Sequence, residues 1–278
     1  MRPPKHPERV TIIAEIGENH LGDLAMARRM IDEAVKAGAD IVKFQSYLGA
    51  DVRPDDPERE WFARVELSDA RHQELKAHTE TQGAAFLSSP FTVERAHFLC
   101  ETLGLRQIKI ASSEMLNVPL LDYVNRHADA VLLSTGMATL DEVRQAVAHL
   151  DRPQVTILHC ITQYPAPDED ANLRAITTLA ERFPDHPIGY SDHTLGIEAC
   201  LAAAALGAAV IEKHFTLAKT LPGTDHVLSA SPEEFAELVR RIRRLEVLLG
   251  QPVKSPVPRE QAIREFVRSR WRKNPEGA

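Results

Sequence analysis

Two histidines stand where they could act together on one ligand. His193 and His214 each follow a short apolar run that is typical of a β-strand, and one helix-like stretch separates the two runs. If the two strands are parallel neighbours, both imidazoles lie at the same end of a sheet, where they can bind a divalent metal or transfer a proton. Either histidine alone is more simply a structural residue at a strand end, so the pair needs support from the rest of the chain.

Lysines and other polar residues follow the remaining strand-like runs. Lys43 and Lys109 lie within two of these runs, near their ends. A buried ammonium group is costly unless an anion lies beside it. Two lysines, several hydroxyls and two histidines around one axis therefore predict a pocket for a small, multiply charged anion and a divalent metal. The other polar residues at the strand ends are Glu15, Asn19, His20, Gln45, Ser88, Ser89, Ser112, Glu114, Ser134, Thr135, Thr162, Tyr164, Ser191, Asp192 and Glu212.

Some residues near these strand ends have simpler structural explanations. Asp192 can cap the turn that follows its strand, and Ser88 can point away from the pocket. The apolar neighbours of Cys160 favour a packed thiol over a nucleophile. Alternation along the same strand turns His159 outward, against the helices. The predicted pocket thus depends on the whole set of residues and not on any single one.

Eight strand-like runs alternate with eight helix-like stretches, which predicts how these residues are positioned. The strands are expected at 10–16, 41–46, 84–89, 107–112, 130–135, 155–161, 187–191 and 209–214, and the helices near 23–37, 69–82, 93–103, 118–128, 139–150, 172–183, 196–206 and 232–249. Glycines at 38, 83, 104 and 207 suit helix ends, and Thr139 with Glu142 and Ser231 with Glu234 suit capping boxes. Continuous apolar strands are typical of parallel sheets with both faces covered.

This pattern predicts an α/β fold, a single-domain (β/α)8 TIM barrel over residues 10–250. About 250 residues is the usual size of such a barrel, and its chemistry takes place at the carboxyl ends of the strands. An open doubly wound sheet is the alternative, but no Gly-x-Gly-x-x-Gly turn follows the first strand. Residues 1–9 are expected to form an N-terminal extension, and residues 251–278, rich in proline and arginine, a solvated and partly frayed tail.

Composition narrows the class of protein. Of the 278 residues, 44% are hydrophobic and 26% charged, as in ordinary globular proteins. The net charge of −7 argues against nucleic acid or an anionic membrane as a partner. Three scattered cysteines form no disulfide framework, and neither a signal peptide nor a membrane-spanning run is visible. We therefore expect a soluble protein of the cytoplasm.

A series of motifs over about residues 10 to 260 resembles the sialic acid (N-acetylneuraminate) synthase family. The motifs are Ile-Ile-Ala-Glu-Ile-Gly-Glu-Asn-His (12–20), Val-Lys-Phe-Gln (42–45), Ser-Ser-Pro-Phe (88–91), Lys-Ile-Ala-Ser-Ser-Glu (109–114), Leu-Ser-Thr-Gly-Met-Ala-Thr-Leu (133–140), Leu-His-Cys-Ile-Thr-Gln-Tyr-Pro (158–165), Gly-Tyr-Ser-Asp-His-Thr (189–194), Glu-Lys-His-Phe-Thr (212–216) and Pro-Gly-Thr-Asp-His (222–226).

The resemblance implies a transferase that condenses phosphoenolpyruvate with the open-chain aldehyde of an aldose, giving a 3-deoxy-2-ulosonic, sialic-acid-like sugar acid and phosphate. It implies a divalent metal, manganese above all, with magnesium or cobalt as alternatives, held by residues matching His193 and His214. Glu15 and Glu114 match carboxylates near the reacting carbons, and Tyr164 and Asp225 match residues that contact the sugar. The phosphoenolpyruvate contacts match Lys43, Ser89, Lys109, Ser112, Ser134, Thr162 and Ser191; we add Gln45 and Glu212 to the substrate-binding residues and count Lys109 as catalytic.

Two departures from the family pattern fall on the sugar side of the pocket. Family members continue into an antifreeze-like domain that caps the partner subunit's site with an arginine, whereas this sequence is expected to lack that domain. The stretch that follows residues 42–45 is also short against the family. The resemblance thus indicates phosphoenolpyruvate more firmly than it indicates the aldose. It also supports a homodimer less firmly, because family dimers rely partly on the antifreeze-like domain. The basic stretch 264–273 is a candidate replacement for the missing arginine.

Two other functions remain open at the level of the sequence. A Schiff-base aldolase would act on pyruvate through Lys109, Lys43 or Lys213. A non-catalytic protein that binds phosphoenolpyruvate or a sugar would need neither the metal pair nor the two carboxylates. Phosphate release from phosphoenolpyruvate in the presence of a metal and an aldose separates these functions from the synthase.

Overall fold

Eight parallel strands form the centre of the unit that contains residues 7–248. The computed structural model describes residues 7–271, and the chain divides into two compact units that meet at residues 248 and 249. The strands follow the order β3-β2-β1-β8-β7-β6-β5-β4, and contact between β3 and β4 closes the barrel. Their bounds are β1 Thr11–Gly17, β2 Ile41–Ser46, β3 Ala85–Pro90, β4 Gln107–Ile110, β5 Ala130–Ser134, β6 Gln154–Cys160, β7 Ile188–Asp192 and β8 Val210–His214. The predicted (β/α)8 barrel is confirmed.

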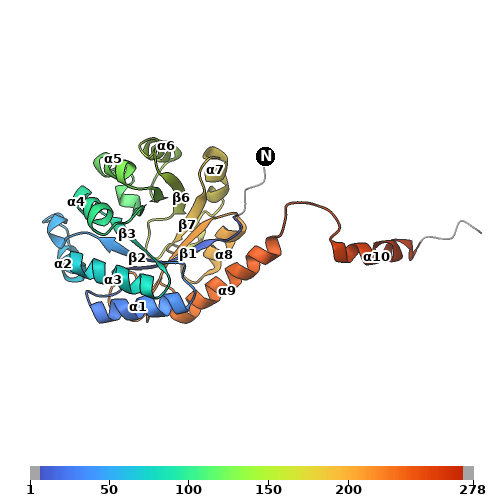
Figure 1. Cartoon of the computed structure of the whole chain (residues 1–278), viewed down its shortest axis with the longest axis horizontal. Helices are drawn as coiled ribbons and strands as arrows, with labels where there is room; N and C mark the ends of the chain where they lie inside the picture. The colour runs from blue at the N-terminus through green and yellow to red at the C-terminus, as the bar shows by residue number, and fades with distance from the viewer. Residues whose placement is uncertain (1–6, 272–278) are drawn as a thin grey trace, which may run out of the picture. The chain divides into compact units, whose positions relative to one another are not determined.

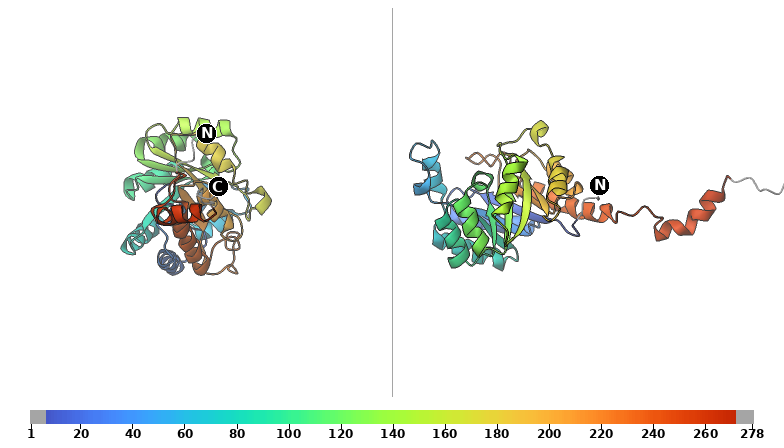
Figure 2. Two further views of the ribbon diagram at one scale, coloured as in Figure 1. Left: turned by 90° about the vertical axis from the view of Figure 1, so that its right-hand side faces the viewer. Right: turned by 90° about the horizontal axis from the view of Figure 1, so that it is seen from above.

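Helices surround these strands in the barrel unit (Figures 1 and 2). The α-helices are α1 Leu24–Lys36, α2 Arg59–Val65, α3 Asp69–Thr81, α4 Val93–His97, α5 Val118–His127, α6 Leu140–Ala148, α7 Ala175–Arg182, α8 Glu198–Ala205, α9 Pro232–Leu249 and α10 Pro258–Ser269. Shorter helical segments are η1 Gly49–Asp51, η2 Phe98–Thr102, η3 Ser112–Glu114 and η4 Asp168–Asp170. All eight predicted helices are present, although α4 is five residues long and continues as the π-helical segment η2.

Local sequence signals explain where these helices begin and end. Thr139 and Glu142 form the predicted capping box of α6, and Ser231 and Glu234 exchange the same pair of hydrogen bonds before α9. The glycines at positions 38, 83, 104 and 207 have positive φ angles between 72° and 101°. Such angles end a helix cheaply only at a residue without a Cβ atom. These caps set the lengths of the βα units.

Two apolar layers hold the barrel together and leave one end free for polar groups. A large cluster of buried residues fills the space between the strands and the surrounding helices. A small cluster fills the barrel interior, and its members are Ile13, Ile41, Leu87, Leu132, Leu158 and Val210. Each of these residues precedes the carboxyl end of its strand. The polar residues at the carboxyl ends therefore lie above an apolar plug, as in other barrels of this kind.

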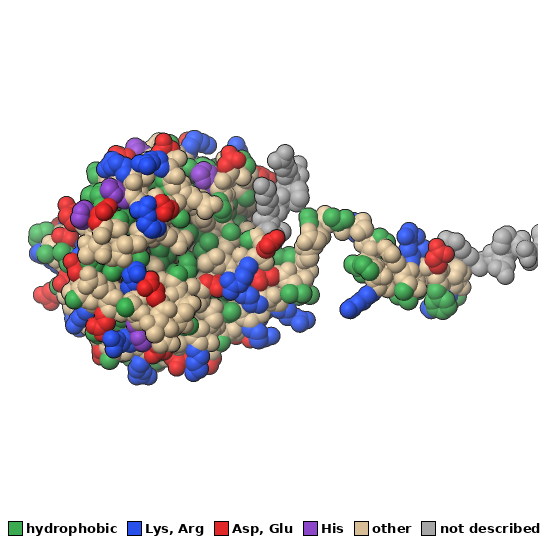
Figure 3. Space-filling model, in the orientation of Figure 1, with side chains coloured by type: hydrophobic (Ala, Val, Ile, Leu, Met, Phe, Trp, Pro, Cys, Tyr) green, Lys and Arg blue, Asp and Glu red, His purple; other side chains and the backbone are tan. Residues whose placement is uncertain are grey.

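Parts of the chain differ from the sequence-based expectation. Helix α2 follows β2 and was not predicted, and the tail contains α10, whose described side chains are exposed. Residues 1–6 of the N-terminal extension and 272–278 of the tail lie outside the described residues, so the stretch 264–273 is described only to residue 271. Among the described residues, no helix is long and apolar enough to cross a membrane. Acidic and basic side chains are interspersed on the visible face of the barrel unit (Figure 3).

Two buried histidines predict that the protein loses stability in mild acid. Burial lowers the pKa of His20 and of His72 from 6.5 to about 4. Between these values each of these two rings binds more protons in the unfolded chain than in the folded one, so their contribution to the free energy of unfolding falls as the pH drops from 6.5 towards 4. Each ring accounts for about 3 kcal/mol across the whole window. Urea unfolding at pH 7, 6 and 5 measures the loss.

A single substitution isolates the contribution of one ring. We expect His72→Gln to reduce the fall in unfolding free energy between pH 7 and 5, because the variant no longer has this buried proton-binding group. The exposed His97, changed to glutamine, is the matched control and should leave the slope of the wild-type protein unchanged. Identical slopes for His72→Gln and the wild-type protein would contradict the explanation.

Candidate active site

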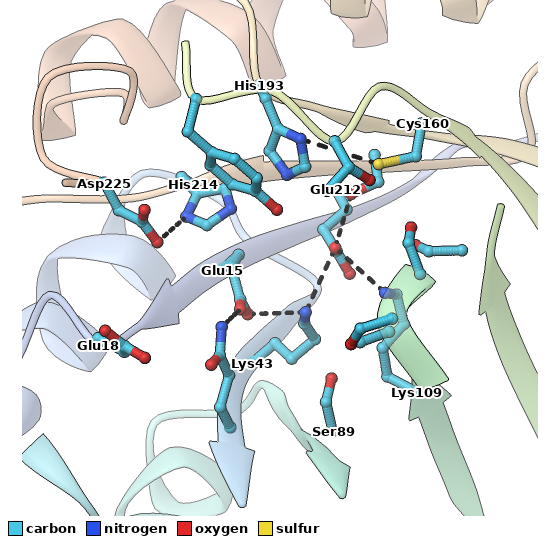
Figure 4. Close-up of a pocket in the computed structure, with 18 of the residues that line it drawn as sticks. Glu15, Glu18, Lys43, Ser89, Lys109, Cys160, His193, Glu212, His214 and Asp225 are labelled. Carbon is cyan, nitrogen blue, oxygen red and sulfur yellow. Dashed lines mark hydrogen bonds and ion pairs between the residues drawn. The ribbon is translucent and has the colours of Figure 1, made fainter. Parts of the chain in front are cut away.

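A cavity of about 390 Å³ opens at the carboxyl ends of the strands. Figure 4 shows its labelled side chains pointing toward one another from several strands. The cavity collects every predicted catalytic, substrate-binding and metal-binding residue except Glu114. The other polar residues expected at the strand ends, Asn19, His20, Ser88, Thr135 and Asp192, do not line it. The predicted residues that line it are Glu15, Lys43, Gln45, Ser89, Lys109, Ser112, Ser134, Thr162, Tyr164, Ser191, His193, Glu212, His214 and Asp225.

Strand register brings the charged residues together. Glu15 on β1 is paired in register with Lys43 on β2 and with His214 on β8. Ser191 on β7 is paired with Glu212 on β8, and its hydroxyl donates to the Glu212 carboxylate at 2.9 Å. Parallel strands that keep this register present their last residues on one rim. The site is therefore a direct product of the barrel's hydrogen-bonding pattern.

Two lysines share one carboxylate at the centre of the cavity (Figure 4). The Lys43 ammonium lies 3.0 Å from Glu15 Oε2 and 3.3 Å from Glu212 Oε1. The Lys109 ammonium lies 3.6 Å from the same Glu212 oxygen. All four side chains are buried. Charges removed from water in this way must compensate one another, because an unpaired buried ion costs several kcal/mol.

The shared environment gives the two carboxylates opposite pKa shifts. Burial raises the pKa of Glu15 to about 7, against the opposing effect of Lys43. Burial also favours the protonated form of Glu212, but Lys109 and Lys43 outweigh it and lower the Glu212 pKa to about 2. Burial lowers the pKa of Lys109, whereas at Lys43 the two carboxylates outweigh burial and raise the pKa. Near neutral pH, Glu212 is thus a fixed anion and Glu15 can exchange a proton.

Hydroxyl groups surround the lysines. The oxygens Ser89 Oγ, Ser134 Oγ and Thr162 Oγ1 are buried and have no hydrogen-bond partner among the described residues. Gly136 allows the rim to close tightly here, because a Cβ atom at this position would lie 2.0 Å from Thr162 Oγ1 and 2.9 Å from Ser112 Oγ. Ammonium and hydroxyl donors that converge in a buried cavity suit a ligand with carboxylate or phosphate oxygens.

The two histidines fit the role of metal ligands. The rings of His193 and His214 lie with their centroids 5.2 Å apart. Burial and the neighbouring His214 lower the pKa of His193 to about 4, and burial lowers that of His214 to about 3, so both rings are neutral near pH 7. His193 Nδ1 donates to the Ile161 carbonyl oxygen at 2.6 Å, which leaves Nε2 as the free lone pair. A ligating histidine is commonly held by such a carbonyl.

The described residues do not supply a complete set of metal ligands. Within residues 7–271, no group of three or more His, Cys, Asp or Glu side chains is arranged to hold a metal ion. Asp225 Oδ2 lies 3.3 Å from His214 Nδ1, though without hydrogen-bond geometry. The Tyr164 ring lies against His193, with centroids 4.0 Å apart. The residues present therefore fit a divalent ion that is held by two imidazoles and completed by substrate or water.

Glu114 is the predicted catalytic residue that the structure does not bring into the cavity. It lies in the 3-10 segment η3, and its carboxylate accepts a hydrogen bond from Asn117 at 2.8 Å, at the start of α5. The turn directs this side chain toward the start of α5. Cys160 lies at the edge of the cavity, and burial raises the pKa of its thiol, which opposes a role as a nucleophile.

Several residues of the cavity were not predicted from the sequence. Glu18 belongs to the first motif, but nothing in the sequence separated its side chain from its neighbours. Glu58, Trp61 and Phe62 belong to the unpredicted α2 and the residue before it, and Thr224 precedes the predicted Asp225. Helix α2 is too short to show clear periodicity, so its residues carried no signal of burial. Phe91, Ala111 and Ser113 complete the unpredicted part of the lining.

Glu18 joins three segments of the cavity wall. Its carboxylate accepts hydrogen bonds from Trp61 Nε1 at 2.5 Å and from the Tyr47 hydroxyl at 3.0 Å. Trp61 lies on α2, and Tyr47 directly follows β2. Burial raises the pKa of Glu18 to about 7. This carboxylate therefore fixes α2 against the barrel rim.

A buried ion pair between Asp192 and Lys213 holds the strand ends that carry the two histidines. Lys213 Nζ lies 2.8 Å from Asp192 Oδ2 and donates to the Thr194 carbonyl oxygen at 2.6 Å. Asp192 Oδ1 accepts from the Thr194 backbone and hydroxyl and from Tyr190. Asp192 precedes His193, and Lys213 precedes His214 in the chain. The pair thus ties β7 to β8 where they present the imidazoles, and Asp192 caps its turn as the sequence suggested.

We expect Lys213→Met to destabilise the protein by about 3–5 kcal/mol, because it leaves the Asp192 carboxylate buried without its cation. Lys219→Met is the matched control, since Lys219 pairs with Glu234 at the partly exposed surface and should cost less than about 1 kcal/mol. Urea unfolding measures both free energies. Equal losses for the two variants would contradict the role given to the buried pair.

Comparisons of this chain with protein families, with individual proteins and with solved structures agree with one another. A model of the NeuB family matches residues 30–254. The chain is 40% identical to the N,N'-diacetyllegionaminic acid synthase of Campylobacter jejuni, over 94% of this chain and 84% of that protein. It is 38% identical to the N-acetylneuraminate-9-phosphate synthase of Mus musculus, over 94% and 76%. The structure of N-acetylneuraminic acid synthetase from Leptospira borgpetersenii superposes with a TM-score of 0.89 at 38% identity, covering 95% and 93% of the chains.

Proposed function

The chain belongs to the NeuB family, and from this premise we propose that it condenses phosphoenolpyruvate with an open-chain aldose. The products are a nonulosonic, sialic-acid-like sugar acid and phosphate. Relatives that cover most of this chain are named as synthases of N,N'-diacetyllegionaminic acid and of N-acetylneuraminate 9-phosphate. We assign the activity to the barrel, residues 10–250. The free, buried cysteines of the chain suit a reducing cytoplasm.

The observation that carries this proposal is the buried pair of lysines. Lys43 and Lys109 converge on one side of the cavity together with the unpartnered hydroxyls of Ser89, Ser134 and Thr162. Phosphoenolpyruvate has a carboxylate and a phosphate close to each other, and these groups repel one another and any anionic nucleophile. Two ammonium groups and several hydroxyls neutralise that charge in a cavity of low dielectric constant, where such contacts are strong.

His193 and His214 would hold a divalent metal next to the donor. When bound there, the metal polarises the aldehyde oxygen of the aldose and makes the carbonyl carbon more electrophilic. We infer manganese as the metal. The Ile161 carbonyl keeps His193 in the tautomer whose Nε2 faces the cavity, and the Asp192–Lys213 pair keeps both strand ends in place.

The remaining steps use the carboxyl group of Glu15. The double bond of phosphoenolpyruvate supplies the electron pair for the new bond between its C3 and the aldehyde carbon, which leaves a positive centre at C2. The aldehyde C=O π bond breaks at the same time, and its oxygen becomes a hydroxyl by taking one of the two protons that the attacking water releases. Water adds to C2 and gives a proton to Glu15, whose pKa of about 7 suits this transfer near neutral pH. The C2 hydroxyl then loses its remaining proton as the C2 carbonyl forms, and the C2–O bond breaks so that phosphate leaves with the electron pair of that bond. Because Glu114 does not line the cavity, Glu15 has this role alone.

We expect Lys109→Ala to reduce phosphate release from phosphoenolpyruvate by at least about 100-fold, since it removes one of the two cations that face the donor. Phosphate is measured in the presence of manganese and a panel of aldoses. Lys76→Ala on α3 is the control, because its ammonium pairs with Glu80 at the surface. Near-normal phosphate release from Lys109→Ala would contradict the assignment.

Removal of divalent metal should abolish turnover, and added manganese should restore it, because two neutral imidazoles are placed to bind such an ion. The same experiment separates the synthase from a Schiff-base aldolase. That enzyme would be indifferent to a chelator and would be inactivated by borohydride in the presence of pyruvate. Lys213 is a poor nucleophile for that reaction, because its ammonium is fully buried and paired with Asp192. Full activity in excess chelator would contradict the metal site.

A further inference from the structure

Three carboxyl groups line the end of the cavity away from Lys109. We call Glu18, Glu58 and Asp225 the acidic mouth. Figure 4 shows Glu18 and Asp225 on the side opposite Lys109, beyond Glu15. Glu58 and the neighbouring Thr224 are exposed although they line the cavity, so this end opens to solvent. A ligand that reaches the donor end must pass, or remain beside, these carboxylates.

Two members of the acidic mouth, Glu18 and Asp225, lie on segments that hydrogen bonds hold in place. Glu18 is fixed by Trp61 and Tyr47. The Asp225 loop is tied to the first strand's loop, since Ser229 Oγ donates to the Asp225 carbonyl oxygen at 2.6 Å and accepts from Asn19 Nδ2 at 2.9 Å. These bonds connect the segments that carry Glu18 and Asp225 to each other.

Helix α2 also packs closely on the Asp225 loop. A Cβ atom added to Gly223 would lie 3.2 Å from two ring carbons of Trp61. Trp61 therefore lies directly over this loop and contacts Glu18 at the same time. The loop, the helix and Glu18 thus contact one another, which holds Glu18 and the backbone at Asp225 in place.

The positive charges of the cavity lie at its other end. Among the described residues that line it, the only lysines or arginines are Lys43 and Lys109, and both are paired with Glu15 or Glu212. A phosphate at the mouth would thus meet carboxylates and no lysine or arginine among the described residues that line this end; the Arg64 guanidinium stacks on the Trp61 ring and does not line the cavity. Like charges brought together in a partly buried site oppose binding strongly.

The geometry of the condensation decides which end of the aldose meets the acidic mouth. The aldehyde carbon must reach C3 of the donor, beside the lysines and the histidines. The far end of the aldose then points toward the mouth. Phosphoenolpyruvate contributes three carbons, so C9 of a nine-carbon product is C6 of the aldose. A product phosphorylated at C9 would require a phosphate at the far end of the aldose.

We propose that the aldose used by this protein carries no phosphate at the end farthest from its aldehyde, and that Glu18 and Glu58, with Asp225, exclude the phosphorylated form. The inference rests on the proposed function and names the substrate class of the same site. Hydroxyl groups of an unphosphorylated sugar can donate hydrogen bonds to these carboxylates, whereas the phosphate dianion that prevails at pH 8 has no proton to donate. Selection of this kind combines an attractive contact for one substrate with repulsion of another.

The test compares kcat/KM for N-acetylmannosamine and for its 6-phosphate, with phosphoenolpyruvate and manganese at pH 8, where Glu18 is ionised. We expect the wild-type protein to prefer the unphosphorylated sugar by at least 100-fold. Glu58→Gln and the double variant Glu18→Gln/Glu58→Gln should lower that ratio, the double variant by about 10-fold or more. Glu60→Gln is the matched control, because Glu60 lies on α2, is exposed and does not line the cavity.

The outcomes separate this inference from the proposed function. Equal or better turnover of the 6-phosphate by the wild-type protein would overturn the inference and leave the synthase activity intact. An unchanged ratio in Glu58→Gln and in the double variant would also overturn it. No turnover of either sugar by a protein that binds phosphoenolpyruvate would contradict the proposed function, and the inference would fall with it. A ratio that falls in both variants and not in Glu60→Gln supports the acidic mouth.

Discussion

The ion pairs that Glu212 forms with Lys43 and Lys109 are the constraint on which the site depends. Two ammonium groups at the top of an apolar barrel would each cost several kcal/mol without an anion. Glu212 lies between them at 3.3 Å and 3.6 Å, and the paired register of β1 with β2 and β8 brings Glu15 to the same place. The barrel can thus hold cations ready for an anionic donor without losing its fold.

The same charge arrangement divides the cavity into two ends. Lysines and unpartnered hydroxyls lie at one end, carboxylates that are fixed by Trp61 and the Asp225 loop lie at the other, and the histidine pair lies between them. This asymmetry suits the proposed reaction, in which an anionic donor is joined to an acceptor without a phosphate. Lys43 is already paired with Glu15 and Glu212. Its charge is therefore not neutralised by the carboxylates at the other end of the cavity.

Most of the barrel could be predicted from the sequence, because strand and helix periodicities and glycine caps are local signals. The residues at the strand ends followed from that prediction, since parallel strands present their last residues on one rim. Glu114 was misplaced because a single turn of 3-10 helix decides which way its side chain points. Glu18 and Trp61 were missed because their contact joins segments 43 residues apart. Burial and pKa shifts depend on such contacts and leave no local pattern.

The most direct test of the central claim follows the oxygen that bridges C2 and phosphorus in phosphoenolpyruvate. In the proposed mechanism, water adds at C2 beside Glu15 and the C2–O bond breaks. Donor labelled with ¹⁸O at the bridging position, incubated with the protein, manganese and an aldose, should release phosphate that retains the label, as measured by mass spectrometry. Unlabelled phosphate would show attack at phosphorus and would contradict the account.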